Sequence, residues 1–138
     1  PLHAQISNMS IAQKIRLAMV GSREAVHILV RDPNKLVHMA AVKSPRVKYP
    51  DAARWAKNKS MPDGVINYIA TNRDWTQSYE CKLNLVNNPK TPLSEVLSLM
   101  NHLRSNDLKQ LMRSRNVPMQ VVRQAKNLYK KRTGGGRR

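Results

Sequence analysis

The chain has 138 residues, a formal net charge of +17 and 41% apolar residues, and these values exclude several classes of protein. The length suits one domain with its own core, and the apolar fraction is too high for a chain that is disordered throughout. The single Cys81 excludes an internal disulfide and a cysteine-ligated zinc site or cluster. The lone cysteine favours a reducing, cytoplasmic compartment, and we find neither a membrane-spanning apolar run nor a signal-peptide pattern.

The apolar residues are those typical of helical cores. The chain has no Phe, two Trp and four Tyr, so that Leu, Val, Ile, Ala and Met supply most of its apolar surface. Small and unbranched side chains lose little rotamer freedom when helices pack on helices. Only five glycines are present, three of them together at 134–136, and an all-β chain needs far more for its turns. The composition therefore predicts an all-α protein.

The predicted elements begin with a linker at residues 1–9. The first helix has a capping-box signature from Ser10 to Gln13, and Trp75, Tyr79 and Leu83 form one stripe of the sixth. Residues 132–138 are predicted to be a flexible basic tail. The helices are predicted at 10–20, 23–31, 33–43, 51–58, 62–72, 75–87, 92–103, 106–114 and 118–131.

Four prolines recur where helices are predicted to begin, a position that proline tolerates because its missing N–H has no partner there. They are separated by 29, 30 and 26 residues and are Pro33, Pro62, Pro92 and Pro118. The predicted caps are Asp32 for the helix at Pro33, Ser60 for the helix at Pro62 and Thr91 for the helix at Pro92. Apolar side chains follow each proline after three, four and seven residues, which places them on one helix face. These residues are Leu36, Val37, Ala40, Val65, Ile66, Ile69, Val96, Leu99, Val121, Val122 and Ala125, with Glu95 as the exception.

Paired helices that repeat every 26–30 residues are typical of an α-solenoid. The segments LVRDPNKLVHMAAVKSP and LVNNPKTPLSEVLSLM resemble HEAT-like repeats, most closely the leucine-rich-variant type with its Asp/Asn-Pro signature. The resemblance spans residues 20–131. It implies a short α-solenoid over 10–131, with about four helix hairpins and about nine helices. Known leucine-rich-variant proteins can carry a cysteine cluster, which this chain cannot form.

The acidic residues have a structural explanation. A carboxylate near a helix N-terminus interacts favourably with free N–H groups and the helix dipole, by roughly 0.3–1 kcal/mol. Only Glu80 is predicted to lie in the middle of a helix. The acids at predicted caps or first turns are Glu24, Asp32, Asp51, Asp63, Asp74, Glu95 and Asp107. Few acids are therefore left to neutralise the bases.

The basic residues recur at the predicted turns, and stacking of repeats would align them as a stripe along one edge. Dipole complementation and solubility explain many single bases, but the whole set exceeds that need. The predicted nucleic-acid-binding residues in the turns are Arg31, Lys57, Lys59, Lys90, Arg113 and Arg115. The terminal residues predicted to extend the stripe are Lys130, Lys131, Arg132, Arg137 and Arg138.

An enzymatic alternative comes from HEAT-like DNA glycosylases, which resemble this architecture and use an acid with tryptophans beside a basic groove. Asp74, Trp75 and Trp55 are the candidates here. However, a role as the N-cap of the sixth predicted helix accounts for Asp74, and both tryptophans fall at predicted core positions. The histidines have no ligand spacing and no phosphate loop is present, so we expect no enzyme, metal site or cofactor. The four histidines are His3, His27, His38 and His102.

The net charge points to an anionic partner. The favoured function is non-enzymatic binding of a nucleic-acid backbone, DNA or RNA, through phosphate contacts and without strong sequence readout. The alternative is a protein–protein interaction scaffold that docks an acidic segment of another protein. Attachment to an anionic membrane is disfavoured, because no predicted helix has exposed aromatics opposite a basic face. No small-molecule substrate is expected.

Overall fold

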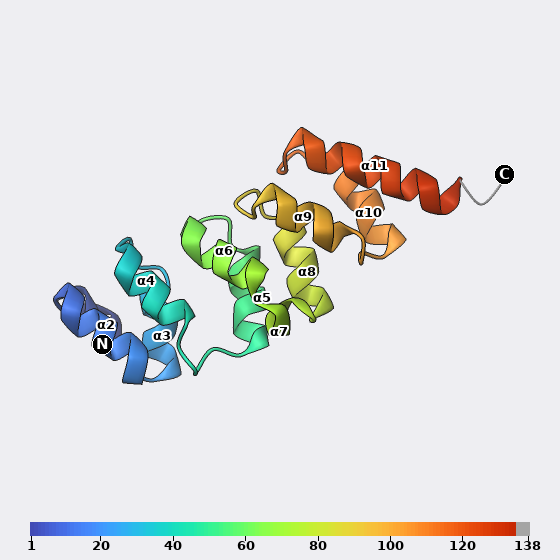
Figure 1. Cartoon of the computed structure of the whole chain (residues 1–138). Helices are drawn as coiled ribbons and strands as arrows, with labels where there is room; N and C mark the ends of the chain where they lie inside the picture. The colour runs from blue at the N-terminus through green and yellow to red at the C-terminus, as the bar shows by residue number, and fades with distance from the viewer. Residues whose placement is uncertain (135–138) are drawn as a thin grey trace.

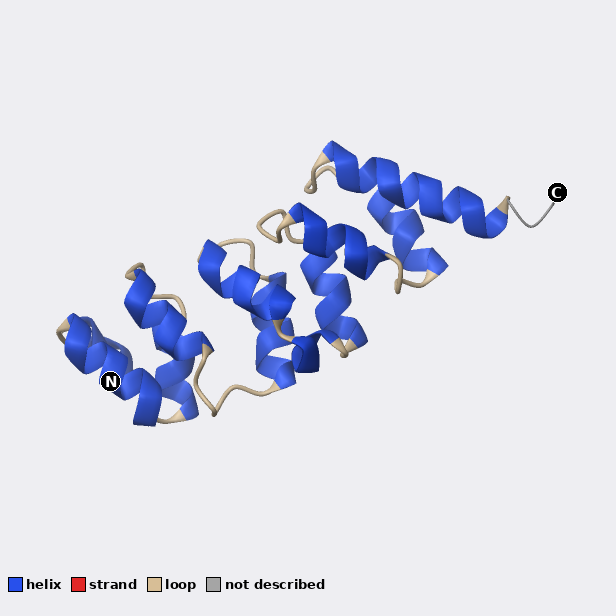
Figure 2. Cartoon of the chain, in the orientation of Figure 1, coloured by secondary structure: helices blue, strands red, loops and turns tan. Residues whose placement is uncertain are grey.

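The computed structural model describes residues 1–134, and all of its regular elements are helices (Figure 2). The prediction of an all-α fold is confirmed. Eleven helices lie in the described part of the chain: α1 (Leu2–Ser7), α2 (Ile11–Val20), α3 (Arg23–Leu29), α4 (Lys35–Val42), α5 (Tyr49–Lys57), α6 (Asp63–Thr71), α7 (Arg73–Thr76), α8 (Tyr79–Val86), α9 (Leu93–Met100), α10 (Ser105–Met112) and α11 (Met119–Thr133).

The helices form an elongated array with α2 near one end and α11 at the other (Figure 1). Helices α2, α4, α6, α9 and α11 follow one another along the array, and α3, α5, α8 and α10 form a second row behind them. Sequential pairs pack together in α3–α4, α5–α6, α8–α9 and α10–α11, and α2–α4, α4–α6, α5–α8 and α9–α11 join one pair to the next. The buried apolar residues form one cluster from Ile6 to Ala125.

Long-range hydrogen bonds from side chains have a nearly constant sequence separation. Within residues 1–134, every such bond between residues more than 20 apart joins partners separated by 25 to 32. Similar units of about 30 residues produce this separation when each contacts its neighbour. The assignment to HEAT-like repeats stays a prediction.

The predicted linker at 1–9 is the first difference from the sequence-based expectation, because α1 forms there and packs against α3. Leu2 and Ile6 are one helical turn apart, so they share a face. Ile6 is 3% exposed and Leu2 packs against the core. Pro1 provides no side-chain cap, so only packing marks this helix.

The predicted helix 75–87 is instead two helices, α7 and α8. The Asn72 side chain accepts a hydrogen bond from Trp75 N–H and caps α7, and the Ser78 side chain accepts one from Cys81 N–H and caps α8. Glu80 therefore lies in the first turn of α8 and not in the middle of a helix. Seven of the eight acids lie in the first turn of a helix, and Asp32 is the exception.

The recurrent prolines lie one or two positions further from the helices than predicted. Pro62, Pro92 and Pro118 are N-cap residues, and Asn34 caps α4 by accepting hydrogen bonds from the N–H groups of Leu36 and Val37. The later start of α4 rotates its buried face by about one residue relative to α6, because each residue advances the helix by about 100°. Leu36, predicted to be in the core, is consequently 66% exposed.

The other predicted caps also differ. Asp32 lies before the cap of α4, where its carboxylate accepts the Asn34 N–H and pairs with Lys14 at 2.8 Å. Thr91 donates its hydroxyl hydrogen to Leu85 C=O, at an oxygen–oxygen distance of 2.6 Å. Ser60 gives no side-chain cap to α6. Asx turns and buried hydrogen bonds therefore replace the expected caps.

Replacing Asn72 by alanine is expected to lower the free energy of unfolding by about 0.5–2 kcal/mol, because the cap of α7 is lost. Asp74, the predicted cap, is exposed in the first turn of the same helix and accepts no capping hydrogen bond. Asp74→Ala is the matched control, with an expected loss of about 0.3 kcal/mol. Urea denaturation measures both, and a larger loss for Asp74→Ala than for Asn72→Ala would contradict the assignment.

Candidate functional site

The candidate site is a row of four similar turns, here named the turn edge. It comprises residues 31–34, 57–62, 87–92 and 113–118, which lead into α4, α6, α9 and α11 along one edge of the array (Figure 1). In each turn a side-chain oxygen accepts the backbone N–H two residues later, a local bond that favours turns over helix. The four acceptor–donor pairs are Asp32–Asn34, Asn58–Ser60, Asn88–Lys90 and Ser114–Asn116.

Five of the predicted binding residues flank these acceptors directly. Arg31, Lys57 and Arg113 come immediately before an acceptor, and Lys59 and Arg115 come immediately after one. All five are exposed. None of them has a side-chain hydrogen bond or ion pair with another residue in the part of the chain that the structure describes. The recurrent turn thus presents several unpaired cations at equivalent positions.

Lys90 differs from the other five because it joins two turns. Its Nζ donates to Met61 C=O at 2.6 Å and lies 3.5 Å from the Asp63 carboxylate. Asn88, which is 2% exposed, donates its amide N–H groups to Ala56 C=O at 2.8 Å and Asn58 C=O at 3.2 Å. Two side-chain hydrogen bonds therefore connect the third turn to the second, and a third connects it to Ala56 in α5.

Asn88→Ala is expected to lower the free energy of unfolding by about 1–3 kcal/mol, because the buried Ala56 carbonyl and the half-buried Asn58 carbonyl lose their donor. Hydrogen exchange should also become faster in residues 57–62, since only the Lys90–Met61 hydrogen bond then joins the third turn to the second. Asn87→Ala is the control, because Asn87 donates only to Leu83 C=O within its own helix. Equal stability of the Asn88 variant and wild type would contradict this role.

The terminal bases do not continue the turn edge as predicted. Arg132 donates from its guanidinium to Leu103 C=O and Asn101 C=O, which lie between α9 and α10 on the opposite edge. Lys130 and Lys131 are exposed in the same last turn of α11. A helix of this length extends about 22 Å, so α11 separates these bases from Arg113 and Arg115. Arg137 and Arg138 lie outside the described residues.

A second basic group on the opposite edge was missed in the sequence. Lys43, Arg46 and Lys48 are exposed between α4 and α5, and the Arg104 guanidinium lies 4.2 Å from the Tyr79 ring centroid before α10. The missed signal was another recurrence of about 30 residues, which places Arg46, Arg73 and Arg104 at the connections into α5, α7 and α10, and Arg132 in the last turn of α11. Positive charge therefore covers both edges.

A buried carboxylate, Asp51, is the centre of the largest ion-pair cluster in the described chain. Its Oδ1 lies 2.6 Å from Arg23 Nη2, 3.3 Å from Arg54 Nη2 and 3.3 Å from His27 Nε2. Burial alone would raise the Asp51 pKa, but the hydrogen bond from Lys48 N–H and the Arg23 ion pair outweigh it, and the pKa is lowered. Burial is the main reason why the His27 pKa is also lowered. This cluster connects α3 with the start of α5.

The residues of the glycosylase-like alternative do not converge on one pocket. Trp55 is 3% exposed and lines a pocket near α1 and α3, whereas Asp74 lines a different, shallower one beside Tyr49. Trp75 packs edge-on against Tyr68, with the ring centroids 5.8 Å apart. The separation of these side chains argues against a shared catalytic site.

The remaining candidate groups have structural surroundings. Cys81 is buried, which raises its pKa to about 11, so the thiol is protonated at neutral pH. The His38 ring is buried, with Nδ1 2.8 Å from Asp32 C=O. Within residues 1–134, no group of three or more His, Cys, Asp or Glu side chains is arranged to hold a metal ion. The helices of the described chain are all too short or too polar to cross a membrane.

Comparison of the chain with protein-family models, with curated proteins and with solved structures finds no match.

Proposed function

We propose that this protein binds the phosphate backbone of a nucleic acid through its turn edge, without catalysis. The observation that supports the proposal is the set of five exposed cations without partners in the described residues. They are Arg31, Lys57, Lys59, Arg113 and Arg115. The ion pairs that acids form in the described residues are with other bases, because Asp32, Asp51 and Asp63 pair with Lys14, Arg23, His27, Arg54 and Lys90.

The spacing of the turns suits an extended polyanion. Packed helices lie about 8–10 Å apart, so four successive turns extend over about 25–30 Å, close to one turn of duplex DNA at about 34 Å. Contacts to phosphates carry no direct sequence information. The expected binding therefore depends on salt and little on sequence, and both DNA and RNA present the required phosphates.

The test replaces Lys57, Lys59, Arg113 and Arg115 by glutamine and measures binding to an unrelated duplex DNA and an unrelated duplex RNA over a range of salt. For wild type on DNA, about five phosphate contacts predict a slope of log K against log salt near −4 to −5. The quadruple variant should lose about one unit of slope per contact and weaken binding to all sequences alike. Its stability should stay within about 0.5 kcal/mol per site.

A charge-matched control separates the turn edge from net charge. Arg16, Arg73, Lys109 and Lys126 are exposed and lie outside the turn edge, so glutamine at these four positions removes the same charge. This variant should keep most of the wild-type slope. An equal loss in both variants would show that only net charge matters. No binding of wild type to either nucleic acid at about 50 mM salt would favour an acidic protein segment as the partner.

A further inference from the structure

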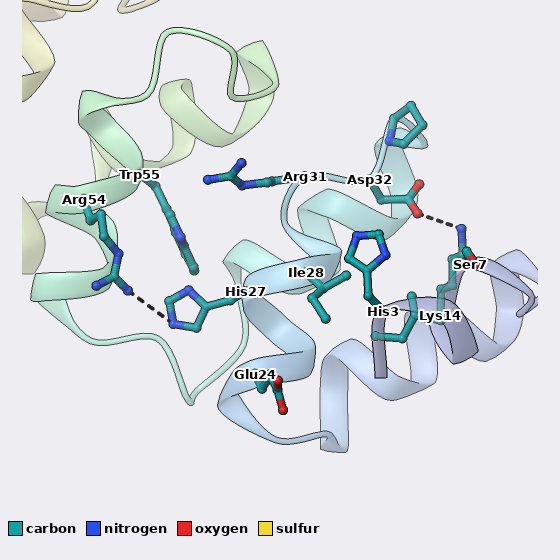
Figure 3. Close-up of a pocket in the computed structure, with 12 residues that line it drawn as sticks. His3, Ser7, Lys14, Glu24, His27, Ile28, Arg31, Asp32, Arg54 and Trp55 are labelled. Atoms are coloured by element: carbon teal, nitrogen blue, oxygen red, sulfur yellow. Dashed lines mark hydrogen bonds and ion pairs between the residues drawn. The ribbon is translucent and has the colours of Figure 1, made fainter. Parts of the chain in front are cut away.

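A pocket of about 800 Å³ lies beside the first turn of the turn edge (Figure 3). Small-ligand pockets commonly have volumes of about 300–1,000 Å³. Helix α1 contributes Ile6 and Ser7 to the wall, α3 contributes Ile28, and α5 contributes Trp55. The α3–α4 turn contributes Arg31. Elements far apart in the sequence thus enclose one concave surface.

The charges around the pocket do not cancel near Arg31. Lys14 is paired with Asp32 at 2.8 Å, so these two charges neutralise each other. Figure 3 shows the Arg31 side chain extending toward Trp55, with Glu24 on the far side of Ile28. Arg31 has no hydrogen-bonding or ion-pair partner among the described residues, and the end of the pocket beside Trp55 therefore has an unpaired guanidinium.

The neighbouring guanidinium of Arg54 adds to this surplus. Arg54 shares the Asp51 carboxylate with Arg23, so two guanidiniums face one carboxylate. His27 belongs to the same cluster, with its Nε2 3.5 Å from Arg54 Nη2, and both side chains line the pocket (Figure 3). The field at the Trp55 end of the pocket is consequently positive.

The apolar part of the wall, formed by Ile6, Ile28 and Trp55, is suited to an apolar body. Ile6 is 3% exposed and Trp55 is 3% exposed, so both present only a small apolar edge that the core holds in place. Ile28 packs against the same core. A guanidinium recognises a carboxylate, sulfonate or phosphate through two parallel N–H donors, and apolar walls favour a ligand with little polar surface elsewhere.

We propose that this pocket binds a small organic anion, with the charged group on the Arg31 guanidinium and the apolar body against Ile28 and Trp55. The proposal does not rest on nucleic-acid binding. The quadruple glutamine variant described above retains Arg31, so the two proposals fail separately.

The test uses Trp55 as a local reporter. Trp75→Phe leaves Trp55 as the only tryptophan of the chain, and energy transfer from it to 8-anilinonaphthalene-1-sulfonate reports binding close to the pocket. We expect saturable transfer with one molecule bound. N-phenyl-1-naphthylamine, which lacks the sulfonate, should bind at least about tenfold more weakly, as the loss of a charged hydrogen bond predicts.

Two variants in the Trp75→Phe background localise the site. Arg31→Gln should weaken sulfonate binding by about tenfold or more, and Ser7→Phe should abolish it by filling the pocket while leaving every charge in place. Arg115→Gln removes a cation of the same turn edge outside the pocket and should change the affinity by less than about twofold. Thermal denaturation of each variant confirms that it is folded.

Three results would overturn the proposal. The first is the absence of saturable transfer up to about 1 mM sulfonate probe. The second is equal binding of the sulfonate and its neutral analogue, because Arg31 then contributes nothing. The third is equal weakening by Arg31→Gln and Arg115→Gln, which would indicate general attraction to a basic surface.

Discussion

Replacing Ile69 by alanine is expected to lower the free energy of unfolding by about 3–4 kcal/mol. Ile69 lies in α6 and is 0% exposed. Helix α6 packs against α4, α5 and α7, so neighbours on several sides hold the site open when the side chain is shortened. The loss combines the transfer energy of the removed carbon atoms with the cost of the cavity that remains. Urea denaturation monitored by circular dichroism measures it.

The control for this variant is Leu36→Ala. Leu36 and Ile69 both belong to the apolar pattern that follows the recurrent prolines, but Leu36 is 66% exposed in α4. Its replacement should therefore cost less than about 0.5 kcal/mol. Similar losses for both variants would show that the buried face of α4 or α6 is wrongly placed. A loss below about 1 kcal/mol for Ile69→Ala would contradict the packing of α6.

Asp51→Ala is expected to lower the free energy of unfolding by about 2–4 kcal/mol at neutral pH. The Asp51 carboxylate is 3% exposed and accepts a hydrogen bond from Lys48 N–H at the start of α5. Loss of this N-terminal contact costs about 0.5–2 kcal/mol, and loss of the charged bond from Arg23 costs about 1.5–3 kcal/mol, part of which solvent recovers because that arginine is exposed. Urea denaturation at pH 7 measures the effect.

The contribution of Asp51 should depend on pH in one direction. Its pKa is lowered in the folded protein, so the unfolded chain takes up a proton first as the pH falls. The stabilisation is present above the ordinary carboxyl pKa of about 4 and is lost below it. Wild type and Asp51→Asn should therefore converge in stability as the pH falls below about 4.

Asp63 provides the matched control for Asp51. Its side chain is 86% exposed, and its nearest cation is Lys90 at 3.5 Å, so Asp63→Ala should cost less than about 1 kcal/mol. An Asp51→Ala variant as stable as Asp63→Ala would show that the cluster around Asp51 contributes nothing to the connection between α3 and α5.

The sequence by itself determined the all-α class and the approximate position of most helices. Both depend on local signals. A stripe such as Val65, Ile66 and Ile69 lies within two helical turns, so the spacing alone places these residues on one face. Prolines such as Pro62 mark a helix start through their own restricted backbone. Acids at first turns such as Glu24 and Asp107 were predicted for the same reason, because the helix dipole acts over one turn.

The tertiary structure decided the features that depend on contacts between distant residues. Helix α1 forms although its sequence contains no capping signal, because Ile6 is buried against α3. The turn at Asn88 is connected to the preceding one by hydrogen bonds across 29 and 30 residues, which no local pattern indicates. Packing of α11 against α9 and α10 likewise placed Arg132 on the opposite edge.

One of the two candidate sites could be predicted from the sequence, and the other is formed only by the tertiary structure. The cations of the turn edge were visible in the sequence, because each flanks a turn that its own residues specify. The pocket beside Arg31 was not visible, since its wall combines α1, α3 and α5, and Ile6 and Trp55 are far apart along the chain. Local chemistry determines where each helix and turn begins, whereas the burial of apolar surface between stacked helices determines which of their side chains meet.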